Sequence, residues 1–199
     1  MAVSLNIDTS GLKTIEKKLW QLEKQIPGAT ASALNRTLDY TSTQWSKLIT
    51  QRYAIKPAEV KKSISKKPAN KSTLNASINV YGHRLSFVHF PFNPKVPGSN
   101  RSVKVKITKE GGYKRIGTKH KPFIATTGAK SADKVQYNVF KRTTDKRSPI
   151  VVLRTLSIPQ MASYKDISEK VQGLAQKKLE ERIEHEIKWR LEKAAGKVK

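Results

Sequence analysis

One block of the sequence, residues 60–162, contains 22 basic residues and only three acidic ones. The whole chain has 40 Lys and Arg against 15 Asp and Glu, and +19 of its formal net charge of +25 lies in this block. Like charges at this density repel one another, so a compact fold needs counterions or an anionic partner beside them. Solvated surfaces usually mix the two signs, so a block this one-sided favours a binding surface.

The anion that such a block binds is a nucleic acid, an anionic membrane or an acidic protein surface. No apolar run reaches the ~20 residues that a membrane-spanning helix requires, and residues 1–5 lack the pattern of a signal peptide. The chain contains no cysteine, which excludes disulfides and thiolate metal sites. We therefore expect synthesis in the cytoplasm and no membrane partner.

Apolar residues at helical spacing predict two amphipathic helices in residues 11–52, because steps of three and four residues line one face of a helix. Pro27 and Gly28 separate the two apolar stripes, and this break predicts an antiparallel helical hairpin. The stripes are Leu12, Ile15, Leu19, Leu22 and Ile26, followed by Leu34, Leu38, Thr41, Trp45 and Leu48. Lys56-Pro57 then predicts a short helix with proline in its first turn.

Residues 163–195 predict a long C-terminal helix, opened by a capping box at 163–166. One apolar face is marked by Ile167, Val171, Leu174, Ile183, Ile187 and Leu191. The residues expected to pack in the core or between subunits are Leu19, Leu38, Trp45, Ile183 and Ile187.

The periodicity changes to two in residues 72–153, which predicts antiparallel strands. The expected pairs are 74–80 with 85–88, across Gly82-His83, and 103–107 with 113–116, across Gly111-Gly112. Further strands are expected at 4–7, 123–125, 135–140 and 150–153. The fold class is therefore α+β in a single domain, residues 1–199: an N-terminal amphipathic helical hairpin, a central antiparallel basic β-sheet or small barrel, and a long C-terminal helix.

Residues able to form a catalytic or metal site are scarce. An enzyme needs nucleophiles, bases or metal ligands that converge on one site. The carboxylates available for such a site in the β region are limited to Glu110, Asp133 and Asp145. The four histidines are His83, His89, His120 and His185. No carboxylate stands at metal-ligand spacing from His83 and His89, and His185-Glu186 has no second histidine to complete a zinc-protease motif. No phosphate-binding loop motif is present. We expect no catalytic residue, no cofactor and no metal, and the protein is not expected to be an enzyme.

The basic strands offer an electrostatic interface instead. Alternation places Lys104 and Lys106 on one face and Val103, Val105 and Ile107 on the other. Phosphate contacts from such a face bind nucleic acid without reading its sequence. The residues expected to face DNA are Arg101, Lys104, Lys106, Lys114, Arg115, Lys119 and Lys121. The aromatic residues Phe87, Phe90 and Phe92 are expected to pack in the core rather than stack on bases.

Two alternatives share this composition. A sequence-nonspecific cellular nucleic-acid-binding protein, for example a ribosome-associated one, would carry similar charge. The cationic hairpin could also bind an acidic partner protein, because cationic faces steer protein encounters as well.

Several segments, in their order and spacing, resemble the prophage minor tail protein Z family of tailed bacteriophages. They are residues 25–36, 55–64, 82–87 and 121–125, and Ser148-Pro149-Ile150 running to Ile158-Pro159-Gln160-Met161 ahead of the long helix. The resemblance implies a tail-completion protein of the virion, at the head-proximal end of the tail, made in the host cytoplasm before assembly. It also implies a homo-oligomeric ring of six subunits with DNA near its inner surface, neighbours that include a tail terminator or tube protein and a head-completion protein, and no catalytic residues.

Overall fold

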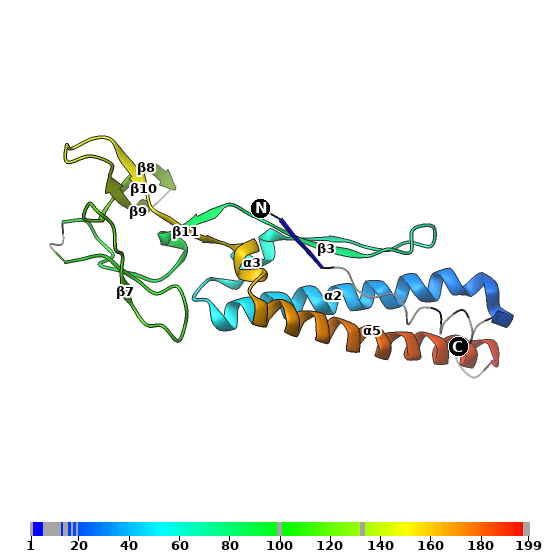
Figure 1. Ribbon diagram of the computed structural model, residues 1–199. Helices are drawn as coiled ribbons and strands as arrows, with labels where there is room; N and C mark the ends of the chain where they lie inside the picture. The colour runs from blue at the N-terminus through cyan, green and yellow to red at the C-terminus, as the bar shows by residue number, and fades with distance from the viewer. Residues whose placement is uncertain are drawn as a thin grey trace.

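Two long helices lie side by side in the computed structural model, which describes residues 2–5, 13, 16, 18, 20–98, 101–131 and 134–196 (Figure 1). They are α2 (Ile26–Arg52) and α5 (Lys165–Ala194). Ser32, near the start of α2, bonds to Glu186, near the end of α5. Arg52, at the end of α2, pairs with Asp166, at the start of α5. The two helices are therefore antiparallel, and we call the pair the stalk.

The stalk is held together by apolar stripes at helical spacing. On α2 the buried side chains include Leu34, Leu38, Trp45 and Ile49. On α5 they recur every four residues, at Ile167, Val171, Ala175, Leu179, Ile183 and Ile187. The predicted C-terminal helix is confirmed, but two members of its predicted stripe are not buried: Leu174 is half-buried and Leu191 is exposed. A stripe with a strict four-residue step passes through Ala175 and Leu179 instead.

Part of the first predicted helix lies outside the described residues, although Lys13, Glu16 and Lys18 are helical, and the break predicted between the two helices of the hairpin is wrong. Pro27 and Gly28 lie in the first turn of α2 rather than between two helices. Proline suits this position because the first turn of a helix needs no N–H donor from it. Trp20–Gln25 forms a 3-10 helix, η1, interrupted at Leu22. Leu12, Ile15 and Leu19 of the predicted first stripe lie outside the described residues, and the helix that packs along α2 is α5.

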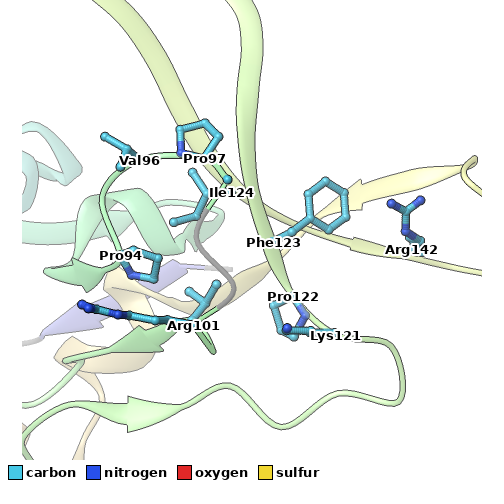
Figure 2. Close-up of a pocket in the computed structure, with 11 residues that line it drawn as sticks. Pro94, Val96, Pro97, Arg101, Lys121, Pro122, Phe123, Ile124 and Arg142 are labelled. Carbon is cyan, nitrogen blue, oxygen red and sulfur yellow. The ribbon is translucent and has the colours of Figure 1, made fainter.

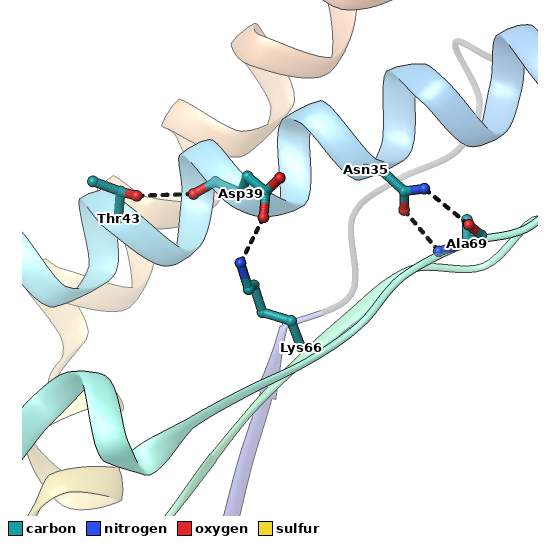
Figure 3. Close-up of polar contacts among 5 residues, drawn as sticks. All are labelled: Asn35, Asp39, Thr43, Lys66 and Ala69. Carbon is teal, nitrogen blue, oxygen red and sulfur yellow. Dashed lines mark hydrogen bonds and ion pairs between the residues drawn. The ribbon is translucent and has the colours of Figure 1, made fainter.

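A three-stranded antiparallel sheet lies beside the stalk (Figure 1). Its order is β1 (Ala2–Leu5), β3 (Ser77–Tyr81) and β2 (Ile64–Lys67), and the predicted short helix, α3 (Pro57–Ser63), leads into it. Asn35 of α2 exchanges two hydrogen bonds with the backbone of Ala69, of 2.9 and 2.8 Å, and Lys66 pairs with Asp39 at 2.6 Å (Figure 3). These contacts fix the end of β2 and the chain after it against the stalk.

The remaining strands form a β head (residues 84–157) at one end of the stalk (Figure 1). The head contains β4 (Arg84–Ser86) paired with β11 (Arg154–Ser157), and the 3-10 helix η2 (Phe87–His89). Its second sheet is β5 (Phe92–Asn93), β6 (Lys104–Val105) and β7 (Lys114–Arg115). Its third is β8 (Phe123–Ser131), β9 (Lys134–Arg142) and β10 (Ile150–Val152). Phe87 and Phe90 are buried, as predicted.

The sheets of the head are small and separate, so the predicted barrel is wrong. Closing a barrel requires one continuous sheet of staggered strands, whereas several strands here have only two or three residues. The predicted pair 103–107 with 113–116 is confirmed, with Lys104 opposite Arg115 and Val105 opposite Lys114.

The predicted pair 74–80 with 85–88 is wrong. β3 pairs with β1 and β2, and β4 pairs with β11, more than sixty residues further along the chain. The capping box also lies elsewhere: Ser157 and Gln160 form it at the start of α4 (Ile158–Ala162), whereas Tyr164 precedes α5 with no side-chain cap. Ser157 is the last residue of β11, and its extended backbone leaves its hydroxyl free to cap the first turn of α4.

Candidate functional site

The hairpin of β6 and β7 carries a cationic hollow on its outer face. Val103 and Val105 are buried, and because side chains alternate along a strand, Lys104 between them points outward. Lys104 and Arg115 are cross-strand partners. Together with Arg101 they line a hollow of about 320 Å³ whose other walls are Asn93, Pro94 and Ser102. Three of the predicted DNA-facing residues therefore meet in one place.

A second hollow, of about 390 Å³, adjoins the first through Arg101. Its cationic side chains are Arg101, Lys121 and Arg142, above apolar side chains that include Phe123 and Ile124. Figure 2 shows the three cations spread along the rim rather than converging on one point. The guanidinium of Arg142 lies 5.3 Å from the centre of the Phe123 ring. The separation of the three cations along the hollow suits an extended anion better than a single small one.

The other predicted residues lie apart from these hollows. Lys106 lines a third and larger depression at the junction of head and stalk. Lys114 is exposed on β7, and Lys119 is exposed in the loop that follows. Arg142 is the cation that sequence reasoning missed. It stands at the end of β9, just beyond the predicted strand 135–140, so no pattern placed it beside Lys121.

The cations of the hairpin, Lys104, Lys106, Lys114 and Arg115, form no ion pair with the residues that the structure describes. Asp145 pairs with His120 at 3.3 Å, and Glu110 is exposed in the turn before β7. The outer face of the head therefore carries an unbalanced positive potential, which attracts polyanions such as a phosphate backbone.

The described side chains offer little for catalysis. No cluster of three or more His, Cys, Asp or Glu within the described ranges is placed to hold a metal ion. His89 and His120 each lie near a single carboxylate, Glu59 and Asp145. Burial raises the pKa of Tyr53, but this residue packs where the stalk meets the head, away from the cationic hollows. No helix in the described part of the chain has the length and apolar composition needed to cross a membrane.

The model of a known protein family matches most of the chain. The family model described as prophage minor tail protein Z matches residues 9–195. This span includes the stalk, the head, and strands β2 and β3 of the sheet beside the stalk. No curated protein and no solved structure matches the chain. Because the match covers nearly the whole sequence, the chain belongs to the prophage minor tail protein Z family.

Proposed function

We propose that this minor tail protein completes the head-proximal end of a phage tail and forms part of the head–tail junction around DNA. Family membership makes the chain a structural protein of the tail, and so of the virion. The proposal adds its position in the tail, its assembly into a ring of six subunits, and contacts with a tail terminator or tube protein and with a head-completion protein. It also assigns the protein a structural role without catalysis.

One observation carries the DNA-facing part of this proposal. Arg101, Lys104 and Arg115 line a single hollow, and neither Lys104 nor Arg115 has an ion pair with any described residue. Lysine and arginine beside phosphates displace condensed counterions, which gives affinity without sequence preference. DNA of any sequence that passes a junction would meet the same favourable surface.

The test replaces four cations of the hairpin, Lys104, Lys106, Lys114 and Arg115, with glutamine. The fold should survive because these side chains lie on the surface of the head or line its hollows. The wild-type assembly should bind unrelated duplexes equally, with an affinity that falls by roughly 0.9 log units per log unit of salt for each phosphate contacted. The variant should show a flatter slope, and phage carrying it should look complete yet retain or deliver DNA poorly.

A matched control removes the same charge from the stalk. Lys165, Lys170, Lys177 and Lys188 are all exposed on α5, and their replacement by glutamine should leave the salt slope close to that of the wild type. An equal loss in both variants would mean that only net charge matters. Normal DNA retention with a failed tail-to-head joint would show instead that the hairpin binds an acidic protein.

The oligomeric state separates a junction protein from a stand-alone nucleic-acid-binding protein. A ring subunit should bind DNA weakly as a monomer, because few phosphates are contacted at once, and strongly when assembled. A monomer that binds as tightly as the assembly would contradict the junction role.

A further inference from the structure

A groove of about 890 Å³ lies where the head meets the end of α2, and we call it the junction groove. Phe90 is buried within it, whereas Val88 and Tyr113 are 37% and 52% exposed. Solvent-exposed apolar side chains that cluster on one surface are typical of a site that another protein segment covers. The apolar floor also distinguishes this groove from the hollow lined by Arg101, Lys104 and Arg115, because a phosphate backbone has no apolar group to place there.

The rim of the junction groove is basic. Lys56, Lys95, Lys106 and Lys109 line it, and none of them forms an ion pair with a described residue. Glu59 places a carboxylate beside the groove, but this carboxylate lies 3.6 Å from His89 and not beside one of the four lysines. The groove therefore suits a segment that combines an apolar anchor with carboxylates, as amphipathic helices do when they bind in grooves.

The chain carries such a segment itself, on α5. Five of its 15 acidic residues lie between Glu180 and Glu192. Glu181, Glu186 and Glu192 are paired within the helix, to Lys178, Arg190 and Lys188. Glu180 and Glu184 have no ion pair among the described residues, and both are exposed one turn apart.

Leu191 supplies the apolar anchor of this segment. It lies seven residues after Glu184 and therefore on the same side of the helix, and it is 45% exposed. Glu180, Glu184 and Leu191 form what we call the acidic face of α5. Two carboxylates without an ion pair, of which Glu180 accepts only a 3.5 Å hydrogen bond from Gln176, and one exposed apolar side chain complement the lysines and the apolar floor of the groove.

We propose that the junction groove of one subunit binds the acidic face of α5 from a second copy of the chain. The groove lies at the head end of the stalk, whereas the acidic face runs from the middle of α5 to its far end. Glu180, the member closest to the head, is 15 residues after Lys165, which is about 22 Å along the helix. One subunit therefore cannot join its own groove to its own acidic face. The contact is head-to-tail, and contacts of this kind repeat from copy to copy and form a ring when the rotation between copies closes. It deepens the subunit-assembly part of the proposed function and does not depend on DNA binding.

Charge reversal on each surface tests the contact. In the first variant Lys56 and Lys109 of the groove become glutamate, and in the second Glu180 and Glu184 become lysine. Each variant alone places like charges across the contact and should sediment as a monomer at concentrations where the wild type assembles. An equimolar mixture should assemble again, because each reversed surface then meets its complement on the other variant. Circular dichroism should show that both variants are folded, since the reversed side chains are exposed.

A matched control reverses Lys61 and Lys62, which are exposed on α3 outside the groove. This control has the same charge change and should assemble like the wild type. A wild-type chain that stays monomeric, a single reversed variant that assembles normally, or a folded mixture that remains monomeric would each overturn the proposal. Because Lys106 also lines the junction groove, failure of the DNA-facing proposal would appear in the salt slope of a variant with only Lys104, Lys114 and Arg115 replaced by glutamine. That variant would leave these assembly results unchanged.

Discussion

Glu186 is a buried carboxylate between the two helices of the stalk. Its Oε1 accepts a hydrogen bond of 2.5 Å from Ser32 Oγ on α2, and its other oxygen pairs with Arg190, one turn further along α5. A buried charge is tolerated only where partners satisfy it. The three side chains therefore fix how α2 and α5 are aligned along their lengths.

Replacing Glu186 with alanine should lower the free energy of unfolding by about 3–5 kcal/mol, because Arg190, whose side chain is only 11% exposed, is left without its partner. Replacing Ser32 with alanine should cost only about 1 kcal/mol. Urea unfolding followed by circular dichroism measures both. The double variant Glu186→Leu with Arg190→Met removes both charges and should be close to the wild type in stability. A double variant as unstable as Glu186→Ala would mean that packing, not charge, explains the loss.

Tyr53 gives the stability a dependence on alkaline pH. Burial disfavours the phenolate and raises the pKa of Tyr53, against a smaller opposing effect of the Arg52 side chain. A raised pKa in the folded state contributes stability that is complete below the unfolded value of about 10 and is lost as pH rises through the folded value. The wild type should therefore lose stability relative to Tyr53→Phe above about pH 10. A difference that stays constant with pH would show that the hydroxyl ionises equally in both states.

At the scale of elements, α5 tests how far a periodic pattern determines burial. Ile187 is 5% exposed and Leu191 is 45% exposed, although both were expected on one apolar face. Ile187→Asp should destabilise the chain by roughly 2–5 kcal/mol, because it places a charge in the core of the stalk. Leu191→Asp should leave the melting temperature of the monomer nearly unchanged. Equal melting temperatures for the two variants would place Ile187 outside the core.

The elements that were predicted from the sequence are those set by neighbouring residues. Steps of three and four residues predicted helix within 26–52 and 165–194, and Gly111-Gly112 predicted the turn before β7. Lys104 between two valines was likewise expected to point outward. These features depend on local geometry, which a sequence pattern records directly.

Features that depend on distant residues were not predicted. The pairing of β4 with β11 joins segments far apart in the chain, and no alternation pattern specifies which strands pair. The same limit applies to the site. Arg142 reaches the rim that contains Lys121 only because β9 pairs with β8, and Glu186 is buried only because Ser32 of α2 faces it.

At the scale of the whole molecule, a structural role predicts that the purified protein does not cut or modify DNA with any divalent metal. Incubation of linear and supercoiled DNA with Mg²⁺, Mn²⁺ or Zn²⁺ measures this directly. The head has few carboxylates to bind such ions, which is the physical reason for the expectation. Cleavage that copurifies with the protein and disappears in Glu110→Ala or Asp133→Ala would contradict it.

The antiparallel stalk also has a consequence for synthesis on the ribosome. α2 emerges early, but its partner α5 begins only at Lys165, after residues 53–164 have been translated. At roughly 5–20 residues per second, those residues take about 6–22 s to make. During that interval the apolar face of α2 around Leu38 and Trp45 has no α5 to cover it. The nascent chain therefore exposes a chaperone-binding surface until nearly the end of translation, and a ribosome that stalls within the head releases a fragment prone to aggregate.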